Sequence, residues 1–228
     1  FQFIASNEEL NIYNENKLWL SKKVISNSIQ KANKIIVQNN YQKNLIKQVF
    51  LKDSYLIKNP VVLKPVSIKA SKQSDAIWVG KSNEIKRPEL FIELAKLNPD
   101  LFFVMICSQN NNEIHNRLKN NLPSNLKFIE RLSLQETEEM INNSRVFVST
   151  SLFEGFPNTF LQAANFNIPV LSLLVDPDNY IAKNNCGFVC NDNVQQLSEK
   201  LNVLIKDKTL YDQFALSHNE YLRSNHDS

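Results

Sequence analysis

The sequence predicts an α/β fold with a Rossmann-like parallel sheet and helices on both of its faces. Short apolar runs rich in Val, Ile and Phe recur along the chain, as is typical of the buried strands of a parallel sheet. Amphipathic stretches with helical spacing separate these runs, and strands that alternate with helices imply βαβ units. The composition suits a packed core, because 43% of the 228 residues are hydrophobic and only 3 are glycine.

Eight short runs are predicted to be strands, because most of them are rich in β-branched and aromatic residues. In chain order they are Lys34–Val37, Tyr55–Ile57, Ala76–Val79, Phe102–Ile106, Leu126–Ile129, Val146–Ser149, Val170–Leu173 and Gly187–Val189. We expect Gly187 to form the turn that leads into the last strand.

The intervening helices are predicted from apolar side chains that repeat three and four positions apart. Pro88 suits the first turn of a helix, and Leu90, Phe91 and Leu94 after it share one apolar face. The segment Asn158–Phe166 is largely apolar, so we expect it to be buried. The other predicted helices are Leu18–Ala32, Tyr41–Phe50, Asn111–Asn121, Gln135–Asn143, Val194–Ile205 and Leu210–Leu222.

A domain boundary is predicted near residues 59–75, where two prolines and a short polar stretch interrupt regular structure. Residues 1–65 supply only about one βα unit, which is too little for an independent domain. Residues 66–208 supply a complete Rossmann-like domain. Residues 209–228 supply a final helix that we expect to pack back toward the N-terminal part. Because the chain begins with Phe1 rather than Met, we expect a fragment that carries the end of a preceding domain.

Composition and charge disfavour several classes of function. Three glycines cannot supply either of the common glycine-rich phosphate loops. The net charge of +3 is well short of a nucleic-acid-binding signature. Neither the three cysteines nor the three histidines have metal-ligand spacing, so we expect no metal site.

Lysines are concentrated between Lys17 and Lys58, where there are nine lysines and one acid, Asp53. The simpler interpretation is a solvated helix face. The alternative is a surface that meets an anionic lipid or a phosphorylated carrier. We expect a cytoplasmic protein, and this alternative would add a peripheral contact with the inner membrane.

The strongest functional signal is the loop Glu154-Gly155-Phe156-Pro157-Asn158, which follows the predicted strand Val146–Ser149. Open α/β sheets bind ligands at the carboxyl ends of their strands. Gly155 allows a close approach of the backbone, Glu154 can accept hydrogen bonds from hydroxyls, and the following helix presents unpaired N–H groups to an anion. The loop therefore suits a ligand that is both anionic and hydroxylated. The alternative is an ordinary strand-to-helix turn in which Asn158 caps the helix.

These residues resemble the glycosyltransferase group 1 (family 4) enzymes, which are retaining transferases of GT-B fold with nucleotide-sugar donors. The family pattern E-G-F-P-N-x-x-x-E-A is matched from Glu154 to Asn158 and at Ala163. A second pattern, Gly-Arg followed by Lys and a helix, corresponds to Gly80, Lys81 and Lys86. Further matches, which extend the resemblance over nearly the whole chain, are Ala32–Val37, Asn59–Val61, Pro169-Val170 and Asp176–Asp178.

The resemblance implies that Lys81 and Lys86 hold the donor diphosphate and stabilise it as the sugar leaves. Gly80 lies directly before Lys81, where the donor phosphates would need the backbone close, so it is expected to be a donor-binding residue as well. Lys81 stands where the family has arginine, so a bidentate contact becomes a point charge. The alternative for Lys86-Arg87 is a solvated helix start.

The resemblance also implies that Glu154 binds hydroxyls of the transferred sugar. The backbone from Gly155 through Phe156, Pro157 and Asn158 to Thr159 would bind sugar and phosphate oxygens.

Two further parts of the donor are assigned by the same resemblance. Gln162 stands where the family has the glutamate that holds the ribose hydroxyls, and it loses a charge-assisted bond. The base is expected at Glu130, Arg131 and Leu132, for which an ordinary exposed loop is the alternative.

The function implied is transfer of a sugar, with retention and without a metal or other cofactor, from a nucleotide-diphosphate sugar to a glycan or lipid-linked acceptor in surface polysaccharide biosynthesis. The acceptor would bind to the N-terminal domain, of which residues 1–65 are the last part. The alternative is a nucleotide-sugar-binding module that is inactive without the rest of that domain. A GT-B-fold epimerase is disfavoured, because the chain lacks recognisable acid–base carboxylates and histidines.

Overall fold

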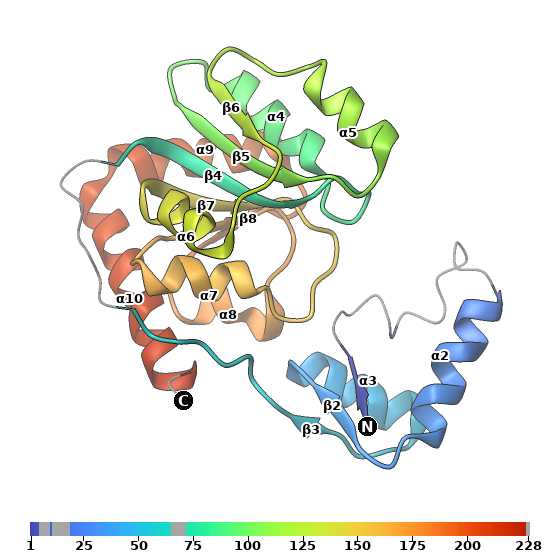
Figure 1. Ribbon diagram of the computed structural model, residues 1–228. Coiled ribbons are helices and arrows are strands. Elements are labelled where there is room, and N and C mark those ends of the chain that lie inside the picture. The colour runs from blue at the N-terminus through green and yellow to red at the C-terminus, as the bar shows by residue number, and fades with distance from the viewer. Residues whose placement is uncertain (5–9, 11–18, 65–71, 227–228) are drawn as a thin grey trace. The chain divides into compact units, whose positions relative to one another are not determined.

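The computed structural model describes residues 1–4, 10, 19–64 and 72–226. Most of the polar stretch at the predicted boundary, and Lys17, lie outside these described residues. The chain forms two compact units (Figure 1). The smaller unit comprises Phe1–Pro60 with Phe153–Pro157, and the larger comprises Val61–Leu152 with Asn158–Ser228. The functions predicted for the two parts are not tested by this division and stay predictions.

The larger unit contains a six-stranded parallel sheet in the order β6-β5-β4-β7-β8-β9. The order steps outward in both directions from β4, as in doubly wound folds. The strands are β4 (Ser74–Lys81), β5 (Phe103–Ser108), β6 (Leu126–Ile129), β7 (Ser144–Ser149), β8 (Val170–Ser172) and β9 (Gly187–Val189). The expected Rossmann-like sheet is confirmed.

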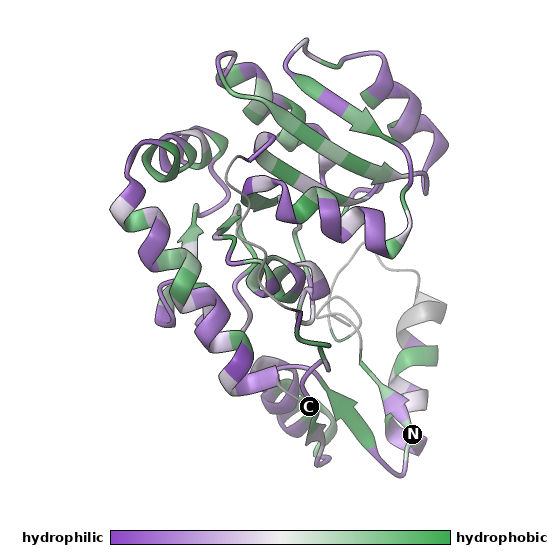
Figure 2. Ribbon diagram, turned by 60° about the vertical axis from the view of Figure 1, so that its left-hand side comes forward, coloured by the Kyte–Doolittle hydropathy of each residue, from purple (hydrophilic) through white to green (hydrophobic). Residues whose placement is uncertain are grey.

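Helices cover both faces of this sheet (Figure 1). The helices are α4 (Pro88–Leu97), α5 (Asn112–Lys119), α6 (Leu134–Asn142), α7 (Asn158–Asn165), α8 (Tyr180–Lys183) with the 3-10 turn η1 (Pro177–Asn179) before it, α9 (Val194–Lys206) and α10 (Lys208–His226). The strands are largely hydrophobic in Figure 2, whereas the helices carry both polar and apolar residues. This is the pattern expected of a sheet buried between two helical layers.

One face of the sheet packs against α4, α5 and α9. On it Trp78, Phe103 and Val146 are buried with Phe91 of α4 and Leu201 of α9. The rings of Phe91 and Phe103 meet edge to face with their centroids 5.6 Å apart, an arrangement that adds to their burial.

The opposite face packs against α7, where Phe147 of β7 and Phe160 of α7 are both buried. Their ring centroids lie 6.2 Å apart in an edge-to-face arrangement. The predicted burial of the helix that begins at Asn158 is thus confirmed. Helix α10 contacts α7 and α9 and belongs to the larger unit. Its predicted contact with the N-terminal part stays a prediction.

The smaller unit has a three-stranded parallel sheet in the order β1-β2-β3. Its elements are β1 (Gln2–Phe3), α2 (Trp19–Lys31), β2 (Ile35–Val37), α3 (Asn40–Phe50) and β3 (Tyr55–Leu56). Ile29, Ile35, Val37, Ile46 and Phe50 form its core. Strand β1 was not predicted, because two residues carry no periodic signal.

The predicted strand Gly187–Val189 is confirmed as β9, but Gly187 does not form the turn before it that was also expected. It is the first residue of β9 and pairs with Val170, so it does not lie in the preceding turn. A Cβ at this position would lie 1.7 Å from the carbonyl oxygen of Val170. The close approach of two strands therefore requires this glycine.

Candidate functional site

The carboxyl edge of the large sheet presents Lys81 at the end of its central strand. Strand β4 continues to Lys81, which pairs with Ser108 at the end of β5. The Lys81 side chain is exposed, and no residue that the structure describes hydrogen-bonds its ammonium group. This cation can therefore meet a ligand at the edge where α/β sheets bind ligands.

The loop after Lys81 is held to the neighbouring strand β7 by hydrogen bonds. The N–H of Lys86 donates to Asn83 Oδ1 at 2.9 Å, and the carbonyl of Lys86 accepts from Thr150 Oγ1 at 2.6 Å. The N–H of Leu152 donates to the carbonyl of Ile85 at 2.8 Å. The backbone of Lys86 is thus fixed on both sides, while its side chain is half-buried.

Arg87 also belongs to this site, and its side-chain contacts were not predicted from the sequence. Its Nε donates to the carbonyl of Thr150 at 2.8 Å, and its Nη1 forms an ion pair of 2.7 Å with Asp192. The side chain is only 13% exposed, so the expected alternative of a solvated helix start is wrong for Arg87. The signal in the sequence was slight: an arginine directly before Pro88, where a capping residue would normally stand.

Gly80 is required by a packing contact within its own strand. A Cβ there would lie 2.6 Å from Cη2 of Trp78, whose ring is 2% exposed. The Trp78 indole N–H donates to Thr150 Oγ1 at 2.9 Å, so this ring also helps to place Thr150. The predicted approach of the Gly80 backbone to a phosphate stays a prediction.

The predicted donor residues after β7 are divided between the two units. Asn158, Thr159 and Gln162 lie in the first turns of α7 in the larger unit. Asn158 is the first residue of the helix and is exposed. Among the described residues, none forms a side-chain hydrogen bond with Gln162, which is half-buried.

The preceding loop, Phe153–Pro157, belongs to the smaller unit and is held there by two asparagines. Asn39 Nδ2 donates to the carbonyl of Gly155 at 2.7 Å. Asn59 Nδ2 donates to the carbonyl of Phe156 at 3.0 Å. Glu154 and Phe156 are half-buried, whereas Gly155 and Pro157 are buried. The Asn39 contact was not predicted, because nothing local to Asn39 points to Gly155.

The predicted base-binding residues lie between β6 and α6, at the carboxyl edge of the sheet. Glu130 Oε1 accepts from Lys119 Nζ at 2.5 Å and lies 3.8 Å from Nε2 of the buried His115. The hydrogen bond and charge of Lys119 lower the pKa of the Glu130 carboxyl. Arg131 is exposed and Leu132 half-buried. Glu130 thus has a protein partner already, which agrees with an ordinary exposed loop as much as with a base site.

The lysine-rich segment has several lysines with structural partners. Lys47 pairs with Asp53 at 2.8 Å, and Lys52 donates to the carbonyl of Ala32 at 3.0 Å just after α2. The ammonium of Lys34 lies 5.8 Å from the centroid of the Tyr55 ring. These contacts favour a structural role for part of the segment.

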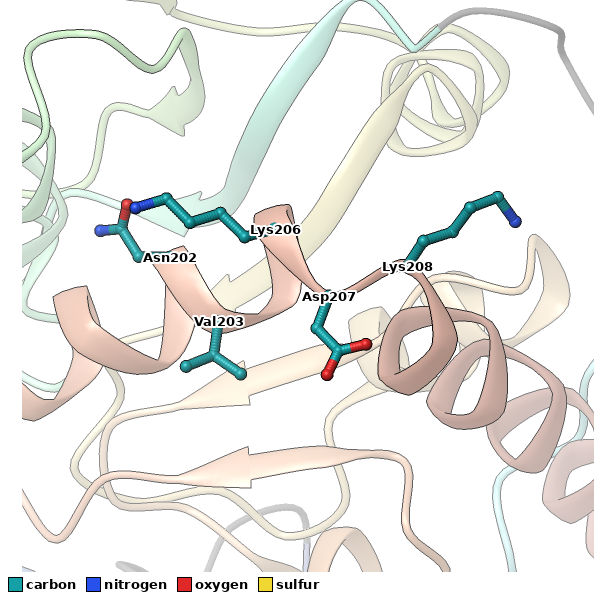
Figure 3. A pocket seen from close by; sticks show the side chains of 5 residues that line it. All are labelled: Asn202, Val203, Lys206, Asp207 and Lys208. Carbon is teal, nitrogen blue, oxygen red and sulfur yellow. The ribbon is translucent and has the colours of Figure 1, made fainter.

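A hollow at the junction of α9 and α10 lies at the other end of the strands. It is lined by Asn202, Val203, Lys206, Asp207 and Lys208 (Figure 3). Arg145, near the start of β7, donates to the carbonyl of Ile205 at 2.7 Å beside this hollow. The hollow is therefore at the amino edge of the sheet and contains none of the predicted site residues.

The described part of the chain contains no group of three or more His, Cys, Asp or Glu residues that could hold a metal ion. None of its helices is both long enough and apolar enough to cross a bilayer.

The chain matches the model of a known family. Residues 63–219 match the family model described as "Glycosyl transferases group 1". The chain belongs to this family. The UDP-Gal:alpha-D-GlcNAc-diphosphoundecaprenol alpha-1,3-galactosyltransferase of Escherichia coli is a relative of this chain. The two are 30% identical over an alignment of 146 residues, which covers 58% of this chain and 36% of that enzyme. The resemblance seen in the sequence is confirmed.

Solved structures of glycosyltransferases share the fold. A mutant of S. aureus TarM, crystallised with Fondaparinux, alpha-GlcNAc-glycerol and UDP, matches with a TM-score of 0.82 at 19% identity, over 99% of this chain and 47% of that one. WaaG, described as a glycosyltransferase of lipopolysaccharide biosynthesis, matches with a TM-score of 0.73 at 17% identity, over 92% of this chain and 64% of that one. These neighbours are GT-B glycosyltransferases, so the predicted fold class is confirmed. The chain spans about a third of the E. coli enzyme and about half of TarM.

Proposed function

We propose that this chain is the donor-binding part of a glycosyltransferase that moves a sugar from a nucleoside-diphosphate sugar to a glycan or lipid-linked acceptor. The observation that carries the proposal is the pair Lys81 and Lys86 on a loop that Thr150 holds beside β7. Helix α7 begins after the same strand. Two cations and a helix N-terminus after adjacent parallel strands form an environment that favours a diphosphate.

In this proposal the lysines act on the leaving group. As the bond between the sugar and the diphosphate breaks, negative charge grows on the phosphate oxygens. The ammonium groups of Lys81 and Lys86 stabilise that charge more in the transition state than in the ground state. No metal is needed for this step. The acceptor attacks the face from which the diphosphate leaves, which gives retention and requires no side chain as a general base.

The remaining contacts of the donor follow the family pattern. Glu154 accepts hydrogen bonds from sugar hydroxyls, and Gln162 bonds the ribose. The loop at Glu130 receives the base. The name of the E. coli relative contains UDP-Gal, so a UDP-hexose is the first donor to test. The same name contains a diphosphoundecaprenol acceptor, which supports a lipid-linked acceptor, a role in surface polysaccharide assembly and work at the cytoplasmic face of a membrane.

A thermal-shift panel tests donor binding. UDP-, GDP- and ADP-sugars are added to the wild-type chain, to Glu154→Ala and to the control Glu199→Ala, which removes an exposed carboxylate from α9. We expect one nucleotide class to raise the melting temperature of the wild type and of Glu199→Ala, and to raise that of Glu154→Ala less. If no nucleotide raises the melting temperature of the wild type, the proposal is wrong.

The alternative is that the 228-residue chain binds the donor but transfers little sugar. The chain's partial coverage of its relatives supports this alternative. Transfer from a radiolabelled UDP-hexose to an undecaprenyl-diphosphate sugar separates the two. Robust transfer by the chain alone overturns the alternative, and donor binding without transfer supports it.

A further inference from the structure

Arg87 joins three segments at the carboxyl edge of the large sheet. Its backbone ends the loop that carries Lys86. Its Nε donates to the carbonyl of Thr150 after β7, at 2.8 Å. Its Nη1 lies 2.7 Å from Asp192, between β9 and α9. Asp192 is itself held by its N–H, which donates to the carbonyl of Leu173 after β8 at 2.7 Å. The Arg87 side chain thus links the loop after β4 to the segments after β7 and β9, and the backbone of Asp192 extends this link to the end of β8.

Arg87 has a backbone conformation that is unfavourable for arginine, which indicates that its side chain has a role at this position. Its φ of 47° and ψ of 54° lie in the left-handed region, which glycine adopts freely and arginine does not. Glycine would fit this backbone better. An arginine in this conformation therefore bears a conformational cost that its contacts with Thr150 and Asp192 must offset.

The guanidinium fixes the part of the loop that presents the proposed diphosphate ligand Lys86. The carbonyl of Thr150 accepts from Arg87, and the Thr150 hydroxyl donates to the carbonyl of Lys86 at 2.6 Å. Thr150 therefore touches two successive residues of the loop by two different groups. Movement of the Arg87 side chain would release one of these contacts and loosen the other.

The charges at this point are only partly balanced. Asp192 is 45% exposed and pairs with one end of the guanidinium. Arg87 Nη2 is buried and has no hydrogen-bond partner among the described residues. The guanidinium thus adds positive potential to an edge where an anion is expected.

We propose that Arg87 is a positioning residue, which holds the Lys81–Lys86 loop in the geometry that receives the donor diphosphate. The inference rests on the proposed function and deepens it. Arg87 does not itself need to touch the donor. It lowers the cost of ordering the loop when the diphosphate binds, which is preorganisation.

The chain offers a matched control in Arg145, which braces the opposite edge of the same sheet. Arg145 donates to the carbonyl of Ile205 at 2.7 Å, lies 3.7 Å from Asp75 and accepts at its own carbonyl from Tyr211. It is a partly buried arginine that links separate segments, as Arg87 is, but it lies far along the strands from Lys81. Removal of either guanidinium is expected to lower stability, whereas only Arg87 is expected to affect diphosphate binding.

The test compares two ligands in calorimetric titrations of the 228-residue chain. The ligands are the nucleoside diphosphate among UDP, GDP and ADP that binds the wild type, and the matching monophosphate. The variants are Arg87→Met, Arg87→Gly, Asp192→Asn and the control Arg145→Met, each at a temperature at which circular dichroism shows it folded. The dissociation constant of the monophosphate divided by that of the diphosphate reports what the second phosphate contributes to binding. A larger ratio means a larger contribution.

We expect Arg87→Met to reduce this ratio by about tenfold, and Asp192→Asn by less. Arg87→Gly removes the conformational cost of the left-handed backbone, but it also removes the guanidinium. We therefore expect Arg87→Gly to reduce the ratio as well. Arg145→Met is expected to lower the melting temperature and leave the ratio unchanged. Should Arg87→Met fail to fold, Asp192→Asn decides by the same ratio.

A wild-type ratio in both Arg87→Met and Asp192→Asn would overturn the inference and leave the proposed function standing. An equal change in Arg87→Met and Arg145→Met would also overturn it, because a general loss of structure would then explain both. If the wild type binds none of the three diphosphates, the proposed function fails, and the inference fails with it.

Discussion

The side-chain amide of Asn39 donates a hydrogen bond of 2.7 Å to the carbonyl of Gly155, which lies 116 positions further along the chain. The same side chain accepts from the N–H of Gln42 at 2.8 Å and so caps the start of α3. Asn39 is 1% exposed. One buried amide therefore joins a helix start to the loop that carries the family pattern, and it uses its acceptor for the first and its donor for the second.

These two uses can be separated by substitution. Asn39→Asp keeps an acceptor for the helix cap but places a carboxylate oxygen against the carbonyl of Gly155. We expect it to lower the free energy of unfolding by about 1–3 kcal/mol, because a buried carbonyl loses its donor. Asn39→Ala loses the cap as well, and a cap contributes about 1 kcal/mol. Urea denaturation of both variants measures the difference.

The control for this prediction is Asn193→Asp, at the N-cap of α9. The Asn193 side chain accepts from the N–H of Gln196 at 2.9 Å and forms no other hydrogen bond within the described part of the chain. We expect Asn193→Asp to be close to neutral, since Asp and Asn cap helices about equally well. Equal effects of Asp at both positions would show that the Gly155 contact contributes nothing to stability.

Gly80→Ala tests whether Trp78 is what requires the glycine. The added methyl group would meet the indole ring at 2.6 Å, and the ring is buried against the core. We expect a loss of about 1–3 kcal/mol in the free energy of unfolding, as is usual for overpacking. The effect is measured by urea denaturation followed by circular dichroism.

A double-mutant cycle supplies the control for this prediction. Trp78→Phe removes the ring atoms that the new methyl group would meet, although it also removes the hydrogen bond to Thr150. We expect Gly80→Ala to cost less in the Trp78→Phe background than in the wild type. An unchanged cost would mean that something other than Trp78 requires the glycine.

Because His218 is buried, we expect the free energy of unfolding to fall in mild acid. Its Nδ1 lies 2.6 Å from the carbonyl of Ile168, and its Nε2 is hydrogen-bonded to the hydroxyl of Tyr180. Burial lowers the pKa of His218 from 6.5 to about 4. Between these two values the unfolded chain binds a proton that the folded chain does not, so stability present above pH 6.5 is lost as the pH falls. The full loss is roughly 3 kcal/mol at pH 4.

The comparison with His218→Gln isolates this contribution. Glutamine cannot gain a proton, so its free energy of unfolding is expected to change less than that of the wild type between pH 7 and pH 5. This interval lies above the range in which most carboxylates titrate, about pH 4. Parallel pH profiles of the two proteins would contradict the assignment.

The sequence predicted the fold far better than it predicted the contacts that hold the site. Strand β5 contains the continuous apolar run Phe103–Cys107, and β7 contains the shorter run Val146–Val148. Such runs are typical of buried parallel strands and can be recognised from the sequence alone. Neither β1 nor α8 was predicted, because elements of two and four residues are too short to show a period. Arg87 was misjudged because its partner Thr150 is 63 positions away, and a hydrogen bond between distant segments leaves no local pattern.

The glycines show the same limit. The sequence assigned Gly80 to the donor site and Gly187 to a turn, whereas the constraint that the structure shows at each position comes from its neighbours. Gly80 makes room for an indole ring of its own strand, and Gly187 makes room for the carbonyl of Val170. Sequence alone shows that a position lacks a side chain, whereas only the packing shows which group occupies the space.

Lys81→Arg is a substitution that we expect to strengthen nucleoside-diphosphate binding. Lys81 is exposed and, within the described part of the chain, its ammonium group has no hydrogen-bond partner, so a longer cation can be accommodated. An arginine restores the residue type of the family pattern and can bind phosphate oxygens with two parallel N–H groups, whereas lysine offers a point charge. We expect nucleoside-diphosphate binding to tighten by about three- to tenfold, which calorimetric titration measures. The control Lys206→Arg makes the same substitution at the amino edge of the sheet, away from the proposed site. It is expected to leave the affinity unchanged. Equal affinities of Lys81→Arg and the wild type would show that this position does not contact the diphosphate.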